Sequence, residues 1–238
     1  GGRATMPAMI EFPDIAIRTV AWSKILLAAG GAVITYVLLR RPKPWLFAAL
    51  LSVLAVTFYL LLVWPLQRMW WGNNGDEMFI LAYLSQVLKG NPWNDFYYHG
   101  LPQFYPPLYF WLTGLISRLF ADNAVSATKF GVAATFGTWF LGTYGVMRLF
   151  ERRVATEYRG QDRSWWWVLI PLVFLFLLDF SDVFLKPYKT LPGLGVTLWI
   201  GLFAREIIAK RWQAKTYLFF GISGGLLFLT YYFWWFMA

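Results

Sequence analysis

Two adjacent carboxylates, Asp76 and Glu77, follow a polar Gly-Asn-Asn-Gly stretch at 72–75, where an apolar run over 45–64 gives way to a long aromatic loop. A carboxylate at the mouth of a membrane span is costly, so its presence there indicates a site. It could act as a general base that accepts a proton from a substrate hydroxyl. The pair could also hold a divalent metal ion, or Asp76 could cap a helix over 78–89 with Glu77 near the positive end of its dipole. The residues leave these alternatives open.

A second short loop, 181–190, carries Lys186 and Lys189 among apolar residues. If this loop faces away from the cytoplasm, two lysines there run against the positive-inside rule. A phosphate or pyrophosphate headgroup would explain them, because lysine serves as a point charge for such groups. Anchoring to ordinary lipid headgroups explains them equally well.

Two further residues of the first loop could contact a substrate. Tyr105 stands in the Phe-Tyr-Pro-Pro sequence of 104–107, where a ring beside prolines could give a sugar a flat surface or anchor the chain in the interface. His99 lies between Tyr98 and Gly100 and is either a polar loop residue or a substrate contact.

Composition restricts the elements that could position these residues. Hydrophobic residues make up 59% of the 238 residues and charged residues only 14%, which is typical of an integral membrane protein. The net charge of +9 is dispersed between apolar runs, which favours contact with anionic lipid or a phosphorylated substrate and argues against nucleic acid. The chain has no cysteine and one histidine, which excludes disulfides, thiolate metal sites and His-ligated haem within the spans.

The pattern predicts an all-α polytopic membrane protein with one transmembrane domain over 1–238. Runs long enough to cross about 30 Å of hydrocarbon occur at 22–39, 45–64, 127–150, 165–180, 191–208 and 217–238. Two further segments, 78–89 and 107–121, have polar residues on one helical face and are predicted to be interfacial helices.

Lysine and arginine indicate the orientation of these spans. If 107–121 does not cross, three short connecting segments carry clusters of basic residues and are predicted to be cytoplasmic. Residues 65–126 then form one large extracytoplasmic loop that contains Asp76. The chain begins without methionine and ends inside an apolar run, so we expect it to be part of a longer protein.

The first loop resembles a known family. Gly-Asp-Glu at 75–77, an amphipathic helix, and Gly-Leu-Pro-Gln-Phe-Tyr-Pro-Pro at 100–107 followed by Phe110 and Trp111 are similar to the GT-C class of polyprenyl-phosphate-dependent glycosyltransferases. Within that class the pattern is most similar to galactan arabinofuranosyltransferases of the mycobacterial type, which also share a Pro-Tyr pair corresponding to Tyr188.

The resemblance implies that Asp76 is the base and that the partner is a lipid-linked sugar donor. It also implies inverting transfer of the sugar to a glycan hydroxyl on the outer side of a bacterial inner membrane. A metal ion assists some members, which could involve Glu77 or Asp95. The main alternative is a non-catalytic membrane subunit, derived from or resembling such an enzyme, that packs against other membrane subunits.

Overall fold

The computed structural model describes residues 14–40, 43–63, 75–96, 98, 100–102, 104–121, 123–154, 165–177, 186–208 and 213–237. Within these ranges the regular structure is helical, and an isolated antiparallel bridge joins Asn94 to Pro102. The all-α architecture predicted from the apolar periodicity is therefore confirmed for the described part of the chain.

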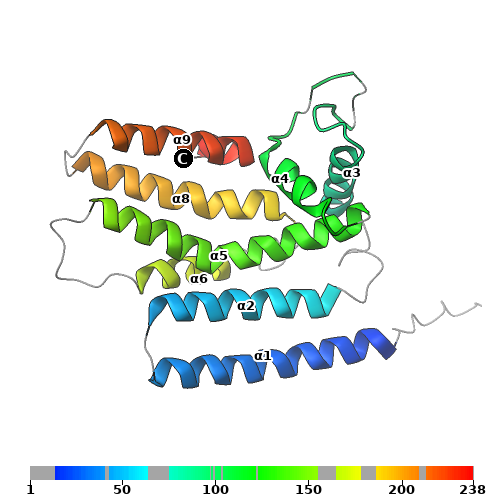
Figure 1. The fold of residues 1–238 in the computed structure, drawn as a ribbon, viewed down its shortest axis with the longest axis vertical. Coiled ribbons are helices and arrows are strands. Elements are labelled where there is room, and N and C mark those ends of the chain that lie inside the picture. The colour runs from blue at the N-terminus through cyan, green and yellow to red at the C-terminus, as the bar shows by residue number, and fades with distance from the viewer. Residues whose placement is uncertain are drawn as a thin grey trace, which may run out of the picture.

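Six helices run side by side, and two shorter ones sit together at one end of this bundle (Figure 1). The side-by-side helices are α1 (Asp14–Arg40), α2 (Pro44–Val63), α5 (Ala124–Val154), α6 (Trp166–Leu177), α8 (Pro187–Ile208) and α9 (Ala214–Thr230). The two end helices are α3 (Asp76–Leu88) and α4 (Leu108–Ser117). Helix α5 contacts α2, α3, α4, α6 and α8, so it connects the bundle to the two end helices.

Two of these helices, α2 and α8, are long and apolar enough by length and composition to cross a membrane. Shorter apolar stretches lie in α1, α4, α6 and α9. Together with the composition, these helices indicate a membrane protein. The other predicted spans remain predictions, although each coincides with one of the side-by-side helices.

Four basic residues lie at one end of the bundle. Arg40 in the last turn of α1, Lys43 just before α2, Arg205 in the last turn of α8 and Lys215 in the first turn of α9 meet at the end opposite α3 and α4 (Figure 1). We call this the basic end, and we call the other the α3–α4 end. Asp76 lies at the α3–α4 end.

The last apolar run, over 217–238, is not one continuous helix in its described part, and the predicted span there remains a prediction. Helix α9 ends at Thr230, Tyr231 is extended, and the short helix α10 (Phe233–Met237) follows. The Trp235 ring packs edge-on against Trp199 of α8, with ring centroids 4.8 Å apart. The chain therefore turns after Tyr231 and lies against α8, because aromatic packing there replaces a longer straight helix.

Helix α4 places its small and polar residues inward. Thr113, Gly114 and Ser117 are buried, whereas Leu112 and Leu115 are exposed. The sequence predicted a surface helix with a polar face, and the structure shows that face packed against the protein instead. Ten helical residues extend only about 15 Å, roughly half the hydrocarbon thickness of a bilayer.

Candidate functional site

Helix α3 begins at Asp76 because Gly75 provides the turn before it. Gly75 has a φ of 54°, a conformation that favours glycine, and its carbonyl accepts the backbone N–H of Met78 at 3.1 Å. Gly75 therefore occupies the N-cap position, with no side-chain capping bond. The predicted helix over 78–89 starts two residues earlier, and Asp76 stands in its first turn and is not the cap.

The two carboxylates occupy different environments because adjacent residues on a helix point about 100° apart. Asp76 lies on the same stripe as Phe79 and Tyr83, one and two turns further along. Glu77 lies on the stripe of Ile80 and is completely buried, with 0% of its surface exposed. The side chain of Asp76 is 42% exposed. Both stripes are buried further along α3, so Asp76 is accessible only at the start of the helix, whereas Glu77 is enclosed.

Asp76 forms an ion pair with Lys186. The Lys186 Nζ atom lies 3.3 Å from Asp76 Oδ2, and the lysine side chain is 28% exposed. Lys186 directly precedes α8, and Pro187 begins that helix, a position at which proline's missing N–H costs nothing. The N-termini of α3 and α8 therefore converge on one pair of opposite charges, although the two residues belong to loops far apart in the sequence.

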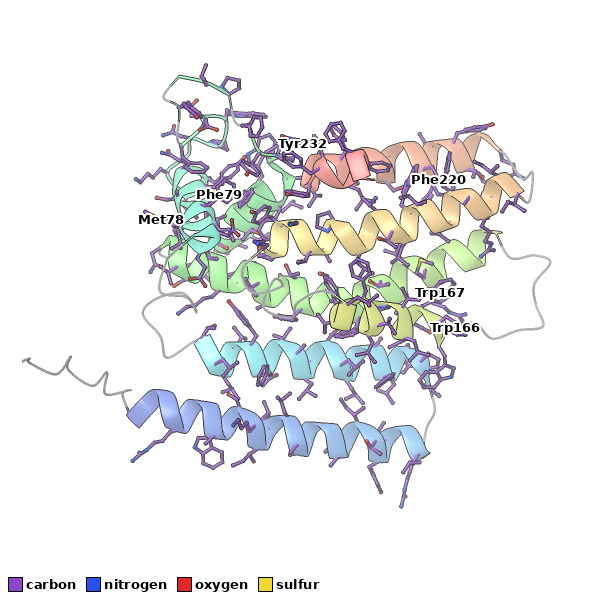
Figure 2. All side chains as sticks on the ribbon, turned by 180° about the vertical axis from the view of Figure 1, so that it is seen from behind. Met78, Phe79, Trp166, Trp167, Phe220 and Tyr232 are labelled. Atoms are coloured by element: carbon purple, nitrogen blue, oxygen red, sulfur yellow. The ribbon has the colours of Figure 1, made fainter. Side chains whose placement is uncertain are left out.

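Aromatic rings pack around Phe79, one turn along α3 from Asp76. Phe79 packs against Tyr105 at a centroid distance of 4.5 Å and against Tyr188 at 5.5 Å. The whole set, which we call the aromatic cluster, comprises Phe79, Tyr83, Phe96, Tyr105, Phe110, Tyr188 and Tyr231. Figure 2 shows Phe79 and Tyr232 at the α3–α4 end, away from Trp166 and Trp167. The sequence predicted Tyr105 and Tyr188 as site residues, and in the structure both rings contact Phe79 of α3, the helix that carries Asp76.

Tyr231 is a further candidate site residue that the sequence did not predict. Its ring lies 5.8 Å from Tyr188 by centroids. Burial raises the pKa of the Tyr231 phenol, nearby Tyr105 and the Asp76 carboxylate add to the rise, and Lys186 opposes it. The phenol is therefore protonated at neutral pH. No local pattern marked it, because Tyr231 stands inside an apolar run that continues to residue 238.

Asp95 organises the aromatic loop between α3 and α4. Its Oδ1 accepts the backbone N–H of Tyr98 at 3.0 Å, and its Oδ2 accepts that of Phe104 at 3.3 Å. Its own N–H donates to the carbonyl of Leu101 at 3.0 Å. Asp95 is buried, so these bonds fix the chain that leads into Tyr105.

The remaining candidates lie as follows. Lys189 stands one turn along α8 from Lys186 and is half-buried. His99 lies outside the described residues. Among the residues that the structure describes, no group of three or more histidine or acidic side chains gathers to hold a metal ion. Asp76 faces a lysine, Glu77 is enclosed and Asp95 binds backbone, so these carboxylates do not fit one metal site, and no step below uses one.

Comparison with known proteins adds a family. A family model described as "Arabinofuranosyltransferase N terminal" matches residues 8–129, slightly more than half of the chain. A galactan 5-O-arabinofuranosyltransferase of Mycobacterium leprae (strain TN) is 31% identical over 77 residues, which are 29% of this chain and 12% of that protein. The match thus spans only a small part of that relative's length. No solved structure was found to match the chain.

Proposed function

Because the chain belongs to the arabinofuranosyltransferase N-terminal family, we propose that it is the membrane-embedded N-terminal part of an inverting GT-C glycosyltransferase. In this proposal the enzyme transfers a sugar, arabinofuranose by the family's name, from a polyprenyl phosphate to a glycan hydroxyl outside the cytoplasm. The observation that carries the proposal is the 3.3 Å pairing of Asp76 with Lys186, a base and a phosphate ligand selected separately from two loops.

The proposed chemistry needs two charges at one place. The acceptor oxygen bonds to the anomeric carbon while the bond from that carbon to the phosphate oxygen breaks. Asp76 receives the hydroxyl proton, and the electron pair of the broken bond remains on the departing phosphate, where Lys186 stabilises the added charge. Holding the hydroxyl in line with that bond supplies much of the remaining rate enhancement.

A membrane arrangement follows from the same proposal. The six side-by-side helices cross the bilayer, and the basic end faces the cytoplasm according to the positive-inside rule. Helices α3 and α4 then lie at the outer surface of a bacterial inner membrane. The exposed Leu112 and Leu115 of α4 support this arrangement, since an apolar outer face suits lipid better than water.

The decisive experiment replaces the proposed base. Asp76→Asn in the natural protein, assayed in membranes with a polyprenyl-phosphate arabinofuranose donor and a galactan oligosaccharide acceptor, should lower transfer by at least about 100-fold, the usual contribution of a general base. Asp14→Asn, the same change at the first residue of α1, should leave transfer unchanged. Wild-type turnover by the Asp76 variant would remove the catalytic role. Turnover absent from the wild-type protein, with partner subunits bound at fixed stoichiometry, would favour the scaffold alternative.

A further inference from the structure

The ion pair poses a problem for the mechanism just proposed. A carboxylate bound to an ammonium group is a weaker proton acceptor, and a lysine bound to a carboxylate is less available to phosphate. In this structure the Asp76 carboxylate and the Lys186 ammonium group are bound to each other. Both must separate before either can act.

The location of the pair favours an anion. Asp76 is in the first turn of α3 and Lys186 directly precedes α8, so the positive ends of a 13-residue and a 22-residue helix converge there. Lys189 adds a second cation within one turn of Lys186. Two helix N-termini and two lysines at one place favour a highly charged anion such as a phosphate.

From this geometry, and resting on the proposed function, we infer that Asp76 occupies the donor-phosphate site of the unliganded enzyme as an internal substitute. The phosphate of the polyprenyl donor replaces the carboxylate on Lys186, and this exchange releases Asp76 to accept the proton of the acceptor hydroxyl. The base therefore becomes available only when the donor is bound, which makes binding ordered, with the donor first and the acceptor second.

The exchange requires little energy because the pair is partly exposed. Ion pairs of this kind contribute little to stability. Removing the Asp76 charge should therefore tighten phosphate binding by about two- to fivefold.

The test measures binding to the natural protein in nanodiscs, using undecaprenyl monophosphate, with undecaprenol and inorganic phosphate as separate probes. The proteins are wild type, Asp76→Asn, Lys186→Gln, the double variant, and Asp76→Asn combined with Lys186→Arg. We expect Asp76→Asn to bind undecaprenyl monophosphate about two- to fivefold tighter than wild type, with a gain that shrinks at high salt. That gain should persist with arginine at position 186 and vanish with glutamine.

Each other outcome counts against the inference. Equal gains with lysine and with glutamine at position 186 would mean that Asp76 simply repels the phosphate, without competing for the lysine. Weaker binding by Asp76→Asn would mean that the two residues hold the phosphate together. If wild type binds undecaprenyl monophosphate no better than undecaprenol, the donor class of the proposed function is wrong and this inference falls with it. If only inorganic phosphate shows the gain, the site takes a soluble phosphate and the lipid donor is excluded.

Discussion

The contact between α3 and α4 can be tested with a single methyl group. A Cβ atom built on Gly114 would lie 2.5 Å from Val87 Cγ1 and 3.2 Å from Val87 Cβ. Carbon atoms in contact normally lie about 3.5–4.0 Å apart, so Gly114→Ala must separate the helices locally by about 1–1.5 Å. Valine cannot swing its methyl groups away, because a β-branched side chain is stiff about χ1.

The cost of this separation follows from the bonds that hold α4 in place. Arg118 Nη2 donates to the carbonyl of Val87 at 2.6 Å, and Trp111 Nε1 donates to that of Pro92 at 2.9 Å. A shift of about 1 Å strains both bonds. We expect Gly114→Ala to destabilise the protein by about 1–3 kcal/mol, the usual range for overpacking, and to lower its apparent melting temperature in detergent.

Two further variants make the prediction specific. Gly195→Ala introduces an equally close contact, 2.5 Å to Leu227 Cδ2, but the leucine end can rotate away, so the melting temperature should hardly change. Val87→Ala removes the clashing methyl groups, so the double variant Val87→Ala/Gly114→Ala should melt higher than the sum of the two single changes predicts. Additive losses, or a loss in Gly195→Ala as large as in Gly114→Ala, would refute the close-packing explanation.

Two more predictions concern the site. Gly75→Ala forces a side chain into a φ of 54°, so it should lower the free energy of unfolding by about 1–2 kcal/mol and weaken donor binding by moving Asp76. Gly145→Ala, in open space on α5, should have neither effect. Unchanged donor binding by Gly75→Ala would contradict this explanation. Asp95→Asn replaces one accepting oxygen with a donor, so the backbone N–H of Phe104 should exchange with deuterium faster, as measured by mass spectrometry. Amides within α8 should keep their exchange rates. An unchanged rate at Phe104 would show that Asp95 does not fix the loop.

The sequence predicted well where composition changes abruptly. The span predicted over 45–64 agrees with α2 (Pro44–Val63) within one residue, because Lys43 and Pro44 mark its start. The run over 217–238 gave no such mark at Tyr231, since tyrosine and tryptophan suit a helix in the interface as well as a turn. Only the tertiary contact of Trp235 with Trp199 decides between them.

The candidate site was predictable in its residues but not in its geometry. Asp76 and Lys186 each stood out as a charge in an unfavourable place, which one segment alone reveals. Their contact depends on how the N-termini of α3 and α8 are brought together, which no local pattern encodes. Separating Asp76 from Glu77 also required the structure, because both have the same chemistry and only the rotation of α3 buries one of them.

The inverted amphipathicity of α4 has a consequence for how such proteins diverge. On a soluble protein the outward side of a helix tolerates polar replacement and the inward side demands bulk. Here Gly114 leaves no room for a larger side chain, and Thr113 and Ser117 are buried beside it, while the exposed Leu112 and Leu115 need only remain hydrophobic. Across homologous proteins, the small residues at positions 113, 114 and 117 should therefore vary least. Positions 112 and 115 should accept any large aliphatic residue.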